Sequence, residues 1–148
     1  MILNNYKDFP SQGRVIGLDW GQRRCGVAVS DETRSFVFVR PQINVKTQQE
    51  LVNAVMKLIK EEDVTGIVVG LPLYSDGSDS DTTKKVREFA DLLAVQTDIP
   101  ILFVEENFNS MVAQQEMGKT SVAKIKQELD SLSAQVILEN AISLSKRN

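Results

Sequence analysis

The hydrophobic pattern of this chain changes its period part-way along, and this change limits the possible folds more than any other feature. Near the start, "RVIGLDW", "RCGVAVS" and "SFVFVRPQI" are short apolar runs separated by turn residues, which is typical of three consecutive β-strands. Beyond them, helical stripes alternate with buried strands. Short connections predict an antiparallel meander for the first three strands, and right-handed crossovers place the later strands beside the first one. We therefore predict an α/β fold with a mixed five-stranded sheet flanked by helices.

The middle of the chain predicts two helices and two buried strands. Thr47 followed by Glu50 fits a capping box at the start of the first helix, and "GIVVGLPL" and "IPILFVEE" are typical of buried strands. The polar loop "YSDGSDSD" precedes the second helix, and we expect its aspartates to be turn and cap residues. A short helix is expected near Ser110 and a last helix from about Asp130 to Leu144. The apolar stripes of the first two helices contain Leu51, Val55, Leu58 and Ile59, and Val86, Phe89, Ala90 and Leu93.

Length and composition indicate a single globular domain over residues 1–148. The net charge is -3 with a pI of about 5.0, so any surface that binds phosphate groups must be local. The N-terminal "MILNNYKDF" lacks the features of a signal peptide, and no apolar run approaches the roughly 20 residues of a membrane span. We therefore expect a cytoplasmic protein.

The chain has no histidine and one cysteine. This composition excludes a zinc site, a disulfide framework, a Ser-His-Asp triad and a Cys-His pair. Cys25 lies in an apolar stretch and is expected to be a small core residue rather than a nucleophile.

Three carboxylates occupy positions that are otherwise apolar. Asp19 ends a predicted buried strand, and Glu105 and Glu106 end another, where alternation sends their side chains to opposite faces. Asp130 falls on the apolar stripe of the last helix, and a carboxylate on a packed face needs a compensating partner. If these carboxylates meet at one place they repel one another, and a divalent cation would resolve the conflict. Ligands that are all oxygen suit magnesium or manganese.

Simpler interpretations of each carboxylate stay open at this point. Asp19 could be a turn or cap residue, and Glu106 a surface charge. Asp130 could be the N-cap of the last helix, with Ser131 as a rival cap. The metal site is favoured by the conjunction of two strand ends and one helix.

Four segments resemble the YqgF/RuvX proteins, which are relatives of the RuvC Holliday junction resolvases and have an RNase H-like fold. "GLDWGQRRCGVAVSD" is similar to the opening motif of that family, and "GIVVGLPLYSDGSDSD" to its Val-Gly-Leu-Pro loop followed by Asp-Gly-Ser. "VEENFNS" and "DSLSAQVILENAI" resemble its last strand and last helix. The likeness extends from about Arg14 to Leu144. Two positions depart from it: Asn107 stands where the family usually has Arg, and Ser133 stands at the spacing of the fourth carboxylate of resolvases.

The resemblance implies a nuclease that hydrolyses phosphodiesters with two Mg²⁺ or Mn²⁺ ions. It places the catalytic and metal-binding carboxylates at Asp19, Glu106 and Asp130, with Asp19 as the bridging ligand. Of the basic residues near these positions, Arg24 matches the family motif and is the first candidate for a phosphate contact. Lys84 and Lys85, at the start of the second predicted helix, are further candidates.

The resemblance also implies a biological role. Family members are associated with maturation of the 5′ end of pre-16S rRNA, and some with branched DNA. We rank precursor rRNA first, branched DNA second, and ribosomal particles as a further partner, with a monomer or a homodimer left open. Two rival interpretations are a magnesium-ATP site of the actin-like type and a non-catalytic RNA- or ribosome-associated scaffold.

Overall fold

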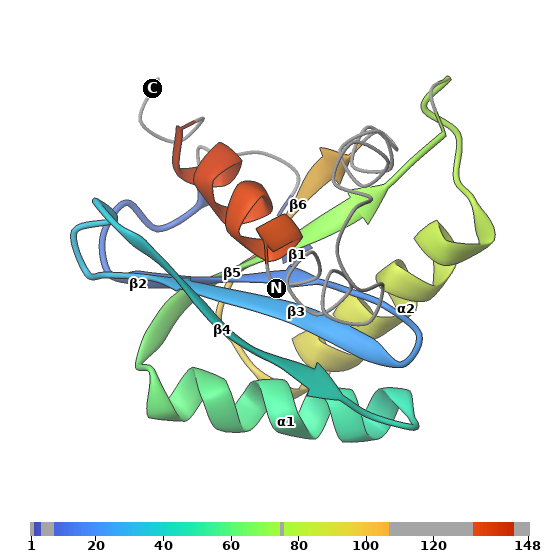
Figure 1. The fold of residues 1–148 in the computed structure, drawn as a ribbon, viewed down its shortest axis with the longest axis horizontal. Coiled ribbons are helices and arrows are strands. Elements are labelled where there is room, and N and C mark those ends of the chain that lie inside the picture. Colours follow the sequence, from blue (N-terminus) through green and yellow to red (C-terminus); the bar gives the residue numbers. More distant parts are fainter. Residues whose placement is uncertain (1, 4–7, 75, 107–131, 144–148) are drawn as a thin grey trace, which may run out of the picture.

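A computed structural model describes residues 2–3, 8–74, 76–106 and 132–143 of the chain. The strands form one six-stranded sheet in the order β1-β6-β5-β2-β3-β4 (Figure 1). In chain order these strands are β1 (Ile2–Leu3), β2 (Arg14–Asp19), β3 (Arg24–Ser30), β4 (Val37–Asn44), β5 (Val64–Pro72) and β6 (Ile101–Glu106).

The sheet is mixed, as the sequence predicts. Strands β2, β3 and β4 form an antiparallel meander, whereas β5 and β6 run parallel to β2 and stack beside it. The predicted count of five strands is wrong by one, because β1 adds a short strand parallel to β6. A strand of two residues is too short to show the alternation by which strands are recognised in a sequence.

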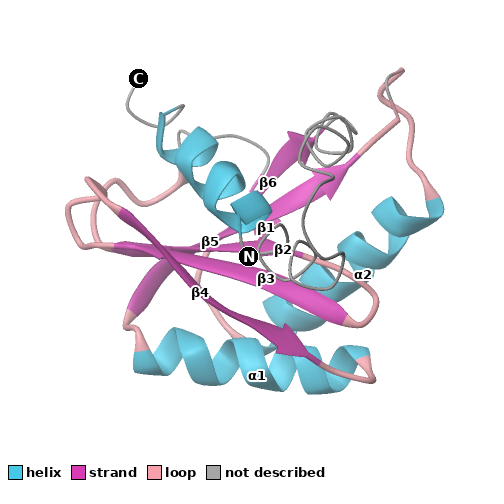
Figure 2. Ribbon diagram, viewed as in Figure 1, coloured by secondary structure: helices cyan, strands magenta, loops and turns pink. Residues whose placement is uncertain are grey.

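Helices cover both faces of the sheet (Figure 2). Helices α1 (Gln48–Glu61) and α2 (Asp81–Gln96) lie on one face, and the C-terminal helix, residues 132–143, lies on the other. Each face has its own layer of buried apolar side chains. We call these layers the α1/α2 layer and the C-terminal layer. No helix in the described part of the chain is long and apolar enough to cross a membrane.

The helix starts are set by side chains that cap the first turn. Thr47 accepts a hydrogen bond from the Glu50 N–H at 3.1 Å, and Glu50 accepts one from the Lys46 N–H at 3.0 Å. This confirms Thr47 as the cap at the predicted start of α1. The reciprocal half of the predicted capping box differs, because Glu50 accepts from the Lys46 N–H rather than from the Thr47 N–H. The cap of α2 is Ser80, whose hydroxyl accepts from the Thr83 N–H. The expectation that an aspartate caps α2 is therefore wrong, because the serine hydroxyl reaches the same N–H; Asp76 is a turn residue, as expected.

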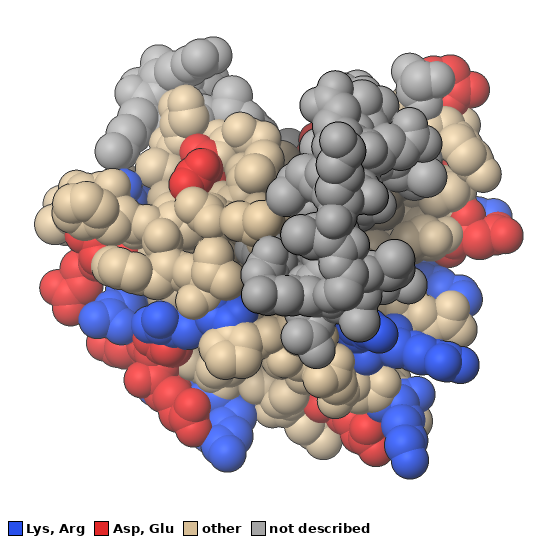
Figure 3. All heavy atoms as spheres, in the orientation of Figure 1, with Lys and Arg blue, Asp and Glu red and all other residues tan. Residues whose placement is uncertain are grey.

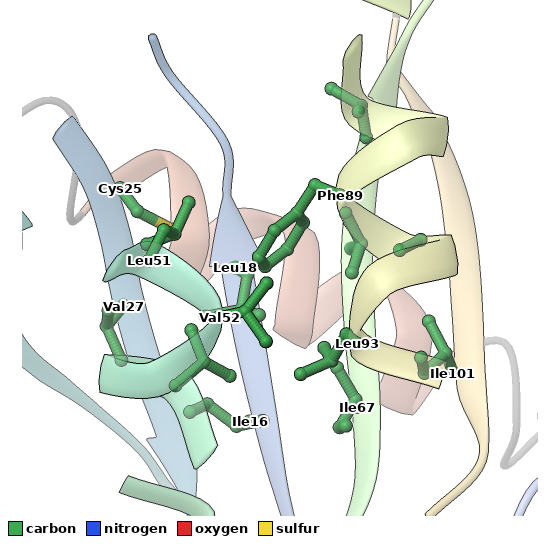
Figure 4. Close-up of a cluster of buried hydrophobic side chains, with 14 of the residues drawn as sticks. Ile16, Leu18, Cys25, Val27, Leu51, Val52, Ile67, Phe89, Leu93 and Ile101 are labelled. Carbon is green, nitrogen blue, oxygen red and sulfur yellow. The ribbon is translucent and has the colours of Figure 1, made fainter. Parts of the chain in front are cut away.

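The predicted helical stripes form most of the helical side of the α1/α2 layer, and strand residues form the other side (Figure 4). Phe89 and Leu93 of α2 and Leu51 of α1 pack against Ile16 and Leu18 of β2. The side chains of Val55, Ile59, Val86 and Ala90 are buried too, whereas Leu58 is partly exposed. Cys25 is fully buried in the same layer, which confirms it as a core residue. The expected short helix near Ser110 lies outside the described residues.

Candidate metal and nucleic-acid site

Asp19 is the last residue of β2 and is half-buried. It pairs with Gly26 across the β2–β3 hairpin. Alternate residues of β2 face the same side of the sheet, and Val15 belongs to the C-terminal layer. Gly17 faces the same helix, because a Cβ built on it would lie 2.8 Å from the Cβ of Leu138. Asp19, two residues further on, therefore lies on the face that the C-terminal helix covers.

Strand β6 ends in the two adjacent glutamates. Leu102 and Val104 belong to the C-terminal layer, whereas Ile101 belongs to the α1/α2 layer. Glu105 thus falls on the α1/α2 face and is exposed at the end of the strand. Strand position 106 has the parity of the C-terminal layer, the face on which Asp19 lies. The side chain of Glu106 lies outside the described residues.

The third predicted carboxylate, Asp130, also lies outside the described residues, as do Ser131 and Asn107. The four residues that define its predicted stripe, Ala134, Ile137, Leu138 and Ala141, are all buried against the sheet. Asp130 precedes Ala134 by four residues, which is about one helical turn. Ser133, at the spacing of the fourth resolvase carboxylate, is partly exposed near the start of the described helix. Among the described residues no three acidic or thiol groups come together, and two of the three predicted ligands are not in that set.

The predicted basic residues lie on two elements beside the end of β2. Arg24 begins β3, pairs with Asn44 of β4 and is half-buried. Lys84 and Lys85 are exposed in the first turns of α2. Within the described parts of the chain, none of these three side chains forms an ion pair, whereas the neighbouring Arg87 pairs with Asp79 at 3.3 Å. On the face shown in Figure 3, basic and acidic side chains are interspersed, so positive charge is local as the net charge predicts.

Comparison with known proteins places this arrangement in a family. The model of the RuvX family, described as "Holliday junction resolvase", matches residues 13–144. The chain belongs to the RuvX family. The predicted family, with its class of enzymes that cut phosphodiester bonds, is therefore confirmed.

Two relatives of the RuvX chain carry the name "Putative pre-16S rRNA nuclease". The one from Maridesulfovibrio salexigens is 37% identical over 128 residues, which cover 85% of this chain and 95% of the relative. The one from Rhodopirellula baltica is 35% identical over 134 residues, covering 89% and 78%. Among solved structures, Thermus thermophilus RuvC in complex with a Holliday junction substrate matches with a TM-score of 0.59 at 13% identity, covering 91% of this chain and 96% of that one. This likeness is one of fold.

The donor chemistry of the RuvX chain fits the hard divalent cation that its family implies. The predicted ligands are carboxylates alone, and the chain has no histidine to bind a softer metal. Asp19 lies half-buried at a strand end rather than in the middle of an apolar layer. A partly exposed carboxylate suits Mg²⁺, which usually retains water and phosphate oxygens among its ligands.

Two residues that sequence reasoning missed are prominent in the structure. Arg34 is 5% exposed, and its guanidinium donates hydrogen bonds to the carbonyl oxygens of Pro10, Gln12 and Gly13. Burial lowers the pKa of Arg34 from its ordinary value. Trp20 follows Asp19 directly, and its indole N–H donates to Gln48 Oε1 at 2.9 Å. The signal for Trp20 was its place in the opening motif, whereas an arginine in a polar turn gives no comparable signal.

Proposed function

We propose that this RuvX protein is a cytoplasmic, divalent-metal-dependent endonuclease that processes the 5′ end of pre-16S rRNA. The observation that carries the proposal is the position of Asp19 at the end of β2. It lies on the face of the C-terminal helix, and strand position 106 has the same parity. The family match and the names of the relatives supply the substrate class.

Asp19, Glu106 and Asp130 are the residues that would hold Mg²⁺ or Mn²⁺, with Asp19 as the ligand shared between two ions. Bound there, the ions would activate water and stabilise the leaving oxygen. The three carboxylates would determine where the positive charge of the bound ions lies. Arg24, Lys84 and Lys85 would hold substrate phosphates beside that charge.

Cleavage of branched DNA is the second candidate function, because the family model is described as a Holliday junction resolvase. Both substrates present phosphodiesters to the same carboxylates. The net acidity of the chain favours neither of them.

Cleavage assays on the two substrates side by side test the proposal. A fragment that spans the 5′ end of precursor 16S rRNA and a four-way DNA junction are incubated with magnesium, manganese or excess chelator. We expect metal-dependent cleavage of the rRNA, loss of cleavage in chelator, and near-background activity for Asp19→Asn, Glu106→Gln and Asp130→Asn. Glu105→Gln is the matched control. It removes the charge of the exposed glutamate next to Glu106, which falls on the α1/α2 face of the sheet, and should retain full activity.

Three outcomes would contradict the proposal in different ways. Preferential cutting of the junction would favour branched DNA as the substrate. Activity in excess chelator or in Asp19→Asn would contradict the metal mechanism. Inactivity of the unmodified protein on both substrates would favour the scaffold interpretation.

A further inference from the structure

A pocket of about 240 Å³ opens beside the turn that follows Asp19. Three parts of the chain form it: the β2–β3 turn, the connection from β4 together with the first turn of α1, and the first half of α2. Its lining includes Trp20, Gln22, Lys46, Gln48, Lys85 and Glu88. None of these residues belongs to the proposed metal-binding set. Lys85 is one of the proposed phosphate-binding residues, and Trp20 follows Asp19 directly in the sequence.

Hydrogen bonds fix the aromatic wall of this pocket. The Trp20 indole N–H donates to the Gln48 side-chain oxygen at 2.9 Å, and the Gln48 amide nitrogen donates to the Lys85 carbonyl oxygen at 3.2 Å. Trp20 also packs against the α1/α2 layer, to which the buried Leu51 of the pocket wall belongs. The indole is thus hydrogen-bonded to α1 directly and connected to α2 through the Gln48 side chain. A ring that is already ordered loses little conformational freedom when a ligand packs against it.

The charge around the pocket favours an anion. Lys46 and Lys85 are exposed and, within the described residues, neither forms an ion pair. Glu88 is the acidic residue of the lining, so the lining carries a net positive charge. Because the chain as a whole has a net charge of -3, a phosphate is attracted to this locally positive pocket rather than to the protein surface in general.

We propose that this pocket binds an unpaired nucleotide of the substrate, with its base against Trp20 and its phosphate near Lys46 and Lys85. An aromatic platform beside basic side chains is the usual way in which proteins hold single-stranded nucleic acid, and stacking of one base contributes about 1–3 kcal/mol. The volume lies below the roughly 300–1,000 Å³ of pockets for drug-sized ligands, which suits a single base.

The position of the pocket connects it to cleavage. Trp20 and Asp19 are consecutive, and Asp19 lies on the face of the C-terminal helix whereas Trp20 packs against the α1/α2 layer. A strand held at Trp20 would therefore pass over the end of β2 toward the carboxylates. This inference rests on the proposed function and adds to it that the substrate carries an unpaired nucleotide beside the cleaved bond.

Trp20 is the sole tryptophan of the chain, so intrinsic fluorescence reports on the pocket directly. The protein with Asp19→Asn, in excess chelator, is titrated with a short single-stranded RNA, a DNA of the same sequence, ribose 5-phosphate and inorganic phosphate. We expect saturable quenching by the oligonucleotides and none by the two probes that lack a base. Stronger quenching by RNA than by DNA would assign the nucleotide to RNA, and the reverse to DNA.

Variants of the lysines test the phosphate contact. Lys46→Ala combined with Lys85→Ala should weaken oligonucleotide binding by at least about tenfold, because the loss of a single charged hydrogen bond already has that effect. Lys60→Ala, which removes an exposed lysine from the last turn of α1, should leave binding unchanged. Absence of quenching by either oligonucleotide, equal quenching by ribose 5-phosphate, or unchanged affinity in the double variant would overturn the proposal. Because the titration uses no metal and no cleavage, its failure is distinguishable from failure of the nuclease proposal.

Discussion

Gly17 on β2 lies so close to Leu138 on the C-terminal helix that a Cβ at position 17 would fall 2.8 Å from the Leu138 Cβ. The same Cβ would lie 2.9 Å from the carbonyl oxygen of Ala134. Because Gly17 has no side chain, this helix can approach the strand that ends in Asp19 more closely than any other residue would allow. Asp130 precedes the same helix in the sequence and lies outside the described residues. If it is a metal ligand, as we propose, we expect the close contact at Gly17 to influence its distance from Asp19.

Substitution of Gly17 by Ala should displace the helix and impair the site. We expect a loss of about 1–3 kcal/mol in the free energy of unfolding, as for other overpacked cores, together with a large loss of metal-dependent cleavage. Denaturant unfolding and the rRNA cleavage assay measure the two effects. Gly66→Ala is the matched control, because its added methyl group would meet the Phe9 ring, a member of the same layer of side chains. It should lower stability and spare the magnesium dependence; equal loss of activity in both variants would contradict a special role of Gly17.

Arg34 holds the segment before β2 against the turn between β3 and β4. Its guanidinium donates to three backbone carbonyl oxygens and lies 5.5 Å from the centre of the Phe9 ring. Arg34→Ala leaves these carbonyls without their donor and should lower the free energy of unfolding by on the order of 3 kcal/mol. Arg34→Lys should recover only part of this, because a single ammonium group cannot reproduce the fork of the guanidinium. Urea unfolding of the three proteins tests the expectation, and equal stability of the Lys variant and the natural protein would contradict it.

Asp31 makes stability depend on pH in the acid range. The Phe36 N–H and the Thr33 hydroxyl donate to its carboxylate, and these hydrogen bonds hold the pKa of Asp31 below its ordinary value. A lowered pKa in the folded state stabilises the protein above the unfolded pKa, and this contribution is lost as the pH falls through the folded pKa. The stability difference between the natural protein and Asp31→Asn should therefore shrink below about pH 4.

Melting temperatures measured from neutral to acid pH test this dependence. Asp91→Asn, which removes an exposed carboxylate without a hydrogen bond or ion pair among the described residues, is the control. If the difference in melting temperature between the natural protein and Asp31→Asn is the same at every pH, the charge of the carboxylate is not what stabilises the turn.

The sequence predicted the elements whose cause is local or periodic. Thr47 caps the first turn of α1 as predicted, and the stripe through Phe89 and Leu93 is buried as its helical spacing requires. Alternation along β6 is enough to assign positions 105 and 106 to opposite faces of the sheet. What escaped prediction depends on contacts between distant segments: β1 is defined by its pairing with β6, and the burial of Arg34 by carbonyls about twenty residues away.

Magnesium or manganese should stabilise the protein through Asp19. Carboxylates that share a site repel one another when no cation is bound, and a ligand that binds only the folded state raises its stability by about 2.7 kcal/mol at a concentration of 100 times Kd. The melting temperature should therefore rise with metal concentration, and Asp19→Asn should abolish most of that rise. The variant without metal should be at least as stable as the natural protein, since one repelling charge is gone. Glu105→Gln should keep the full metal response, and an equal response in Asp19→Asn would contradict Asp19 as a ligand.

Arg24 should contribute to affinity for nucleic acid through charge alone. It lies across the β2–β3 hairpin from Asp19, two residues before the Gly26 that pairs with Asp19. If its guanidinium neutralises one phosphate, Arg24→Ala should weaken binding and make the slope of log K against log salt concentration shallower by about 1. The measurement is a salt titration of RNA binding with cleavage blocked by chelator. Lys57→Ala, which removes a lysine paired with Glu61 on α1, should leave the slope unchanged. If Arg24→Ala lowers affinity by the same factor at every salt concentration, Arg24 acts by shaping the hairpin and not by binding phosphate.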